Sequence, residues 1–127
     1  MNVLLDSTAL IDALRKKPAC LRALESLLMS GETLATSAVN VGEIYAGLRP
    51  NEEGRAEDLL SSIAVQPVTT SIAKRAGELK NKAARKGVTL ELDDMLVAAT
   101  ALELGYAVWT ENTKDFSVPG VVFYKAS

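Results

Sequence analysis

The stretch NVLLDSTALIDALRKKP, residues 2–18, decides the fold because it joins a buried strand to a helix through one acidic residue. Residues 2–5 form a largely apolar run, which is typical of a strand buried on both faces. A helix is expected from about Thr8 to Lys16, and Pro18 prevents it from continuing. Asp6 therefore lies directly after the strand, where the helix begins.

The rest of the chain repeats this alternation of short apolar runs and helical segments. Strands are expected at residues 2–5, 33–36, 64–68, 106–109 and 121–124, with Pro67 favouring an edge position for the third. Helices are expected at about 8–16, 19–30 and 93–104. Three more are expected between them: one capped by Ser37, one that ends at about Ser62, and a long one capped by Thr70 or Ser71. This order predicts an α/β domain in which helices cover both faces of a mostly parallel sheet. The length of 127 residues suits a single domain, residues 1–127.

The composition removes several classes of function. The sequence has no histidine, which excludes histidine-ligated zinc, Ser-His-Asp triads and histidine acid–base catalysis. The chain has a single cysteine and therefore cannot form an intramolecular disulfide, which fits a reducing cytoplasm. No apolar run reaches the roughly 18 residues of a membrane span, and the first residues do not resemble a signal peptide. We therefore expect a cytoplasmic protein whose chemistry depends on carboxylates, hydroxyls, amides, lysine, arginine or that one thiol.

Glu43 is the only charged residue in SAVNVGEIYAGL, residues 37–48. It points away from the apolar stripe that runs from Val41 to Leu48, so an ordinary solvent-exposed glutamate is one interpretation. The opposite face carries small or uncharged residues, however, and a helix without a charged face is usually buried on most sides. A carboxylate in such a place must be paired, neutralised or bound to a metal ion. Spacing alone leaves both interpretations open.

Two further polar segments follow later in the chain. LDDMLVAATALELG, residues 92–105, begins with two acids, although one would satisfy a helix cap; we expect Asp93 to be the cap and Asp94 the functional group. TENTKDF, residues 110–116, supplies Thr110, Asn112 and Asp115 after a strand, where ordinary turn chemistry is the alternative.

These acids are expected to converge at one edge of the sheet, because binding crevices in such folds lie beyond the carboxyl ends of the strands. The four that follow strand ends or begin neighbouring helices are Asp6, Glu43, Asp94 and Asp115. Ionised carboxylates packed together repel one another, and a divalent cation removes that conflict. Oxygen ligands without histidine or cysteine suit Mg²⁺ or Mn²⁺, and such a site could support phosphodiester hydrolysis.

A basic segment covers residues 74–86, whereas the formal net charge of the chain is -2. A solvated helix face explains such a segment without any binding role. The alternative is a contact with a nucleic-acid backbone. The residues concerned are Lys74, Arg75, Lys82, Arg85 and Lys86, with Lys80 among them.

These motifs together resemble a PIN-domain ribonuclease, specifically a VapC-type toxin of a toxin–antitoxin pair. LLDSTALID resembles the opening strand and its acidic motif, and SAVNVGEIYAGL resembles the helix that carries the glutamate. LDDMLVAATALELGYAVWTENTKDF and VPGVVFY resemble the later acidic segment and the closing strand. The resemblance runs nearly end to end.

The resemblance implies a three-layer α/β/α sandwich with about five short strands and metal-binding roles for Asp6, Glu43 and Asp94. Asp115 is expected to be the fourth acid, although the family sometimes has its acid at the position of Asn112. It implies supporting roles for Thr8, Thr110 and Asn112, one or two Mg²⁺ or Mn²⁺ ions, and RNA contact by the basic segment. Glu111 departs from the family, in which a basic residue is common there.

The resemblance also implies partners. These are an RNA substrate, with tRNA or another structured RNA as candidates, a VapB-type antitoxin that covers the acidic groove, and a second copy of the chain in a homodimer. The expected setting is the prokaryotic cytoplasm, with no membrane contact. The alternative functions are a catalytically inert PIN-like module that binds RNA or protein, and a phosphotransfer domain with an aspartate nucleophile. Asp6-Ser7-Thr8 lacks the second aspartate that one large phosphatase family needs there.

Overall fold

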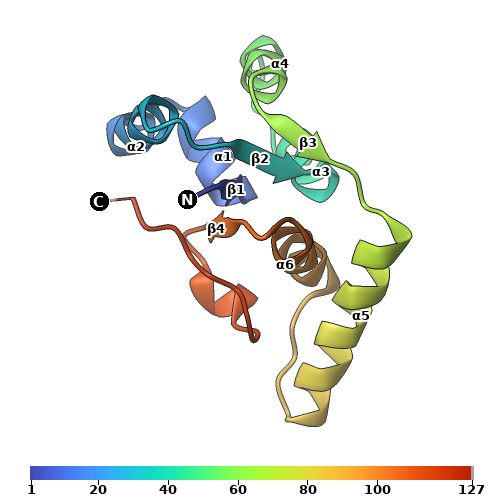
Figure 1. Ribbon diagram of the computed structural model, residues 1–127. Coiled ribbons are helices and arrows are strands. Elements are labelled where there is room, and N and C mark those ends of the chain that lie inside the picture. The colour runs from blue at the N-terminus through green and yellow to red at the C-terminus, as the bar shows by residue number, and fades with distance from the viewer. Residues whose placement is uncertain (127) are drawn as a thin grey trace.

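A computed structural model describes residues 1–126 and shows short strands alternating with helices (Figure 1). The strands are β1 (Val3–Leu5), β2 (Leu34–Ser37), β3 (Ala64–Gln66) and β4 (Ala107–Trp109). The helices are α1 (Ser7–Leu14), α2 (Pro18–Met29), α3 (Ala38–Ala46), α4 (Glu53–Ser61), α5 (Thr70–Arg85) and α6 (Leu92–Leu104), and a 3₁₀ helix, η1, covers Thr113–Phe116. No helix among these is long and apolar enough to cross a membrane.

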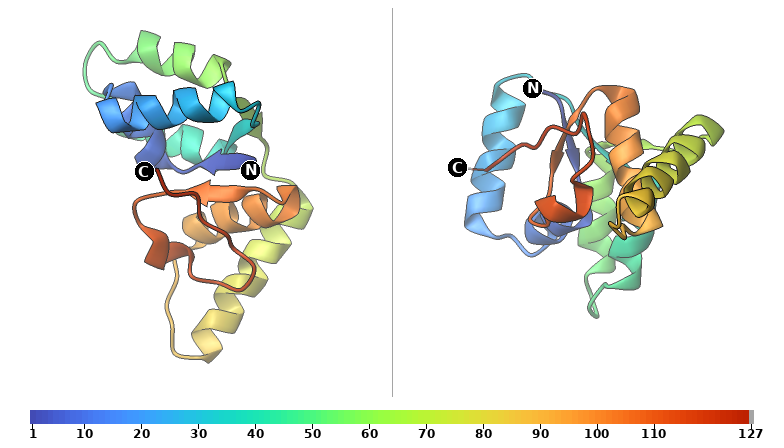
Figure 2. Two further views of the ribbon diagram at one scale, coloured as in Figure 1. Left: turned by 60° about the vertical axis from the view of Figure 1, so that its left-hand side comes forward. Right: turned by 90° about the horizontal axis from the view of Figure 1, so that it is seen from below.

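The four strands form one parallel sheet in the order β3-β2-β1-β4. β3 lies at the edge, as Pro67 predicts. Figure 2 shows α1, α2 and α4 on one side of the sheet and α5 and α6 on the other. The expected three layers are therefore present, with β1 and β2 at the centre.

Alternation along β1 divides the core in two. Val3 and Leu5 pack with α1 and α2, whereas Leu4 faces α5 and α6 on the opposite side. All three side chains are fully buried. This double burial explains why the strand is apolar throughout, and it fixes the position of Asp6 at the point where the strand leaves the core.

The expected fifth strand, residues 121–124, is reduced to a single bridge between Val108 and Phe123. β4 has three residues, and its outer members bond towards β1: Ala107 N–H donates to the Asn2 carbonyl, and the Trp109 carbonyl accepts from Asp6 N–H. Only the backbone of Val108 therefore faces outward, where it bonds to residues 122 and 124. The prediction of a strand at residues 121–124 was wrong, because this segment pairs with β4 at one bridge only.

The N-terminal cap of α5 also differs from the expectation. The hydroxyl of Thr69 accepts a hydrogen bond from Ile72 N–H at 3.1 Å, so the cap is Thr69 and not Thr70 or Ser71. We predict that Thr69→Ala lowers the free energy of unfolding by about 1 kcal/mol. Thr70→Ala, a matched control on an exposed threonine, should change it by less than about 0.5 kcal/mol. Urea denaturation measures both, and equal losses would contradict the cap assignment.

Candidate active site

The polar residues that follow β1, β2 and β4 meet at the carboxyl edge of the sheet. Asp6 follows β1 and is the N-cap residue of α1, Ser37 ends β2, and Thr110 follows β4. Parallel pairing brings these strand ends side by side, and the Asp6 N–H bonds to the Trp109 carbonyl at 3.0 Å. The expected convergence of Asp6 and Thr110 is confirmed.

Asn40 links two of the acids from within α3. Its side-chain amide donates to Asp6 Oδ1 at 3.0 Å and lies 3.2 Å from Glu43 Oε1, with Ser7 Oγ also at 3.0 Å. Its carbonyl oxygen accepts from Ser37 Oγ at 2.7 Å. It also accepts from Ser37 N–H at 3.4 Å, while Asn40 N–H donates to Ser37 Oγ at 3.3 Å, and these two bonds form the capping box that starts α3. Asn40 is fully buried. The beginning of the helix and the spacing of Asp6 and Glu43 therefore depend on one side chain.

Glu43 is half-buried and bonds to α1. Its Oε1 accepts a hydrogen bond from Ser7 Oγ at 2.6 Å. Burial raises the pKa of Glu43, and the carboxyl groups of Asp93 and Asp6 raise it further, whereas the bond from Ser7 opposes them. The interpretation of Glu43 as an ordinary exposed glutamate is therefore wrong.

Thr110 supports Asp6 from the opposite side. Its hydroxyl donates to Asp6 Oδ2 at 2.8 Å and accepts from Asn112 N–H at 3.0 Å. Since that hydroxyl has a single hydrogen, the Thr8 hydroxyl must be the donor in the 3.3 Å contact between the two threonines. Thr8 in turn accepts from Glu111 N–H at 3.1 Å. Both oxygens of Asp6 are thus held by donors, and the turn after β4 is tied to α1.

The pKa of Asp94 is raised by its burial and by several other carboxylates. Burial is the main cause that raises its pKa to about 7, and the charges of Asp93, Asp115, Asp6 and Glu43 add to it. These acids come from the β1–α1 junction, α3, α6 and η1. The four acids predicted from the sequence therefore influence one another across one edge of the sheet.

Asp93 does not have the capping role expected of it. The N-cap residue of α6 is Glu91, without a side-chain cap bond, and Asp93 is already inside the helix. The Asp93 carboxyl instead contributes to the raised pKa of Glu43. The side chain was misassigned because the helix begins earlier than expected, at Leu92.

Sequence reasoning also missed Ser7 and Asn40 as members of this site. Ser37-x-x-Asn40 has the spacing of a capping box, with Asn in place of the usual Glu or Gln. That pattern could have identified the local bond, but the contacts with Asp6 and Ser7 join residues more than thirty positions apart.

The donor set fits a hard divalent cation, because it consists of carboxylate and hydroxyl oxygens under like-charge repulsion. Within residues 1–126, however, no three carboxyl groups are already placed close enough together to hold a metal ion. The acids share one edge but do not form a closed ligand shell. A cation there must draw the side chains inward or be held through water.

Comparison with known proteins gives the context for this geometry. Residues 3–120 match the PIN domain family. The chain is 35% identical to Ribonuclease VapC10 of Mycobacterium tuberculosis, over 93% of this chain and 96% of that protein. It resembles a solved toxin–antitoxin complex from Klebsiella pneumoniae at 29% identity and TM-score 0.79, covering 98% of this chain and 99% of that one. VapBC2 of Rickettsia felis shares the fold at TM-score 0.87 and 22% identity, over 98% of both chains.

We predict that Asn40→Ala lowers the free energy of unfolding by about 2–3 kcal/mol, because the buried Asp6 and the half-buried Glu43 lose a donor and the capping box of α3 loses one side chain. Asn81→Ala is the matched control: Asn81 is exposed on α5, and its loss should cost less than about 0.5 kcal/mol. Chemical denaturation of both variants without metal ions measures the difference. Similar values for the two would show that Asn40 does not hold the acids together.

The raised pKa of Asp94 predicts a pH dependence. In the unfolded chain this group titrates near 3.8, and in the fold near 7, so folding stability is lost as the pH rises through that interval. Asp94→Asn should therefore stabilise the metal-free protein at pH 8 by about 1–2 kcal/mol, after allowance for solvent screening. Thermal unfolding between pH 4.5 and pH 8 would show a smaller decline of the melting temperature for the variant than for wild type.

Glu91→Gln is the control for this experiment, because it removes an exposed carboxylate from the same end of α6. The melting temperature of this control should fall with pH as much as that of wild type. A steep decline that persists in Asp94→Asn would mean that other groups cause it.

Proposed function

The chain belongs to the PIN-domain family, and from this premise we propose that it is a Mg²⁺- or Mn²⁺-dependent endoribonuclease toxin that hydrolyses RNA phosphodiester bonds. The observation that carries the proposal is the set of acids at one sheet edge, where burial and then mutual repulsion raise the pKa of Asp94 to about 7. PIN-domain ribonucleases generally use divalent metal ions. The identity of the ion and the use of one or two ions are part of the proposal.

Four carboxylates would hold the cation or cations: Asp6, Glu43, Asp94 and Asp115. When bound, a divalent cation lowers the pKa of a water molecule and offsets charge on the phosphate. Asn40, Ser7 and Thr110 keep Asp6 and Glu43 at fixed positions through the bonds described above. Thr8 orders the backbone at Glu111. The rigid support is what lets the carboxylates accept a cation without a large rearrangement of the backbone.

We also propose a VapB-type antitoxin as inhibitor, in line with the toxin–antitoxin complex from Klebsiella pneumoniae. An arginine from such a partner can replace a cation among the carboxylates, because a guanidinium binds carboxylates through two parallel bonds. A homodimer and a structured RNA substrate, with tRNA as a candidate, complete the proposal.

A catalytically inert PIN-like module that binds RNA or protein is the second candidate. The observation in its favour is that no three carboxyl groups of the described residues form a ready metal site. The retained acids at all four expected positions favour the nuclease, since an inert module has no need of the charge repulsion that they create.

We predict that the purified, antitoxin-free chain cleaves small RNA with Mg²⁺ or Mn²⁺ and is inactive with EDTA. Asp94→Asn should lower the cleavage rate at least a hundredfold, because it removes a ligand charge from the site. Asp58→Asn, a change of the same chemistry on an exposed residue of α4, should retain the wild-type rate. Cleavage that survives EDTA, or folded protein that cleaves no RNA, would count against the metal-dependent nuclease.

The ends of the products test the mechanism separately. In-line attack by water breaks the bond to the 3′-oxygen and leaves a 5′-phosphate and a 3′-hydroxyl. Attack by the ribose 2′-hydroxyl would instead leave a 2′,3′-cyclic phosphate. End labelling of the fragments distinguishes the two, and we expect the 5′-phosphate.

A further inference from the structure

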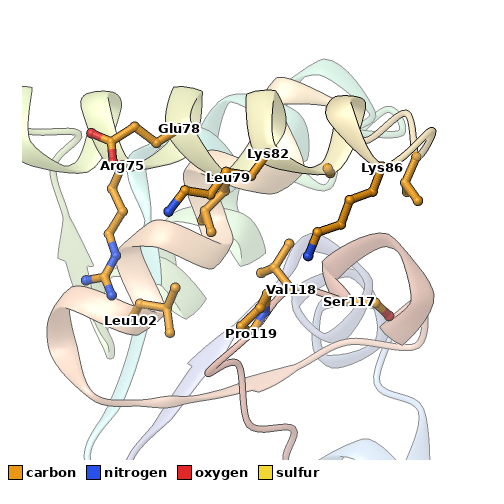
Figure 3. A pocket seen from close by; sticks show the side chains of 11 residues that line it. Arg75, Glu78, Leu79, Lys82, Lys86, Leu102, Ser117, Val118 and Pro119 are labelled. Atoms are coloured by element: carbon orange, nitrogen blue, oxygen red, sulfur yellow. The ribbon is translucent and has the colours of Figure 1, made fainter.

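A cavity of about 360 Å³ lies between α5 and the segment that follows η1, outside the set of acids. Figure 3 shows its two walls, with side chains of α5 on one side and Leu102, Val118 and Pro119 on the other. The volume falls at the lower end of the roughly 300–1,000 Å³ that small-molecule sites occupy. The cavity can thus hold a group of moderate size.

The lining combines an apolar floor with a cationic rim. The floor is formed by Leu79, Ala83, Val88, Leu102, Val118 and Pro119. The rim is supplied by Arg75 and Lys82 of α5 and by Lys86, the C-cap residue of that helix. Apolar surface beside positive charge suits a ligand with a flat apolar body and an anionic group, and a nucleotide has both.

Two of the three cations are available to such a ligand. Arg75 Nη1 is paired with Glu103 Oε1 at 3.3 Å, but within the described part of the chain neither Lys82 nor Lys86 has an ion-pair partner. Glu78, the acid of the lining, extends towards Arg75 and away from Lys86 in Figure 3. The part of the rim nearest Ser117 therefore carries net positive charge.

Both walls of this positive part are followed along the chain by elements of the acidic edge. Ser117 and Val118 directly follow η1, which carries Asp115, and Ser117 Oγ donates to the Thr113 carbonyl at 3.3 Å. On the other wall, Lys86 leads into the short segment before α6, where Asp94 lies in the first turn. Lys80 Nζ bonds to the Leu90 carbonyl, which ties α5 to that segment. Both walls thus continue into elements that carry the acids.

We propose that this cavity binds one nucleotide of a single-stranded part of the RNA substrate, beside the bond that is cleaved. Lys82 and Lys86 contact the backbone phosphate, and the base lies against the floor formed by Leu79, Leu102 and Val118. The proposal deepens the nuclease assignment and rests on it. It assigns RNA contact to Lys82 and Lys86 of the basic segment but not to Lys74 or Arg85, which do not line this cavity.

The test is the binding of a fluorescent single-stranded oligoribonucleotide in EDTA, where cleavage is suppressed. Lys82→Ala/Lys86→Ala should weaken binding about tenfold or more and lower the slope of log K against log salt by about 0.7, the value for one lost phosphate contact. Lys74→Ala/Arg85→Ala removes the same charge from the same helix and should weaken binding less than threefold. Equal effects of the two pairs would show a diffuse charge attraction and overturn the proposal.

A second variant tests occupancy of the cavity without a change of charge. Ala83→Leu fills the floor with a good helix former and should weaken binding several-fold at unchanged thermal stability. Wild-type protein should also prefer the oligoribonucleotide over an abasic strand of equal length. Unchanged binding by Ala83→Leu, or no preference over the abasic strand, would limit the contact to phosphate and overturn the nucleotide site.

Cleavage by wild type, measured separately in Mg²⁺, keeps the two proposals distinguishable. If wild type cleaves RNA but the cavity variants bind as wild type does, the cavity assignment fails alone. If wild type binds polyglutamate tightly and the cavity variants bind RNA as wild type does, the cavity is a site for an acidic peptide, which likewise overturns the nucleotide site. If wild type binds RNA through the cavity but does not cleave, the nuclease assignment fails and the binding site stands.

Discussion

Repulsion between carboxylates at the carboxyl edge of the sheet is the constraint that the site is built around. Three donor side chains restrain it in part: Asn40 bonds to Asp6 and lies beside Glu43, Ser7 bonds to Glu43, and Thr110 bonds to the other oxygen of Asp6. Among residues 1–126 no side chain donates a hydrogen bond to Asp94, and its pKa is raised to about 7. The structure thus fixes two acids and leaves a third dependent on a proton, a cation or a partner's positive charge.

Much of the fold could be predicted from local patterns. Buried runs such as residues 2–5, helix stops at Pro18 and Gly105, and the cap at Ser37 each carry a local physical signal, and all appear in the structure. The parallel sheet follows from their alternation, and it places Asp6 and Thr110 side by side. For this reason the position of the site was predictable before any contact was known.

Other features depend on contacts that no local pattern encodes. The segment 121–124 has the composition of a strand, but whether it pairs along its length is decided by the three residues of β4. Asp93 resembles a cap, but its role changes because α6 begins at Leu92. Asn40 resembles an ordinary polar residue on a helix, and its bond to Asp6 spans 34 positions in the sequence. These outcomes require tertiary structure.

The most direct test of the account is a count of bound Mn²⁺ by electron paramagnetic resonance, without RNA. The signal of free Mn²⁺ should fall in proportion to added protein, to an endpoint of one or two ions per chain. Asp94→Asn should leave most of the ion free. If the wild-type protein leaves the Mn²⁺ signal as it is in buffer alone, the acids at the sheet edge do not form a cation site, and the central claim is contradicted.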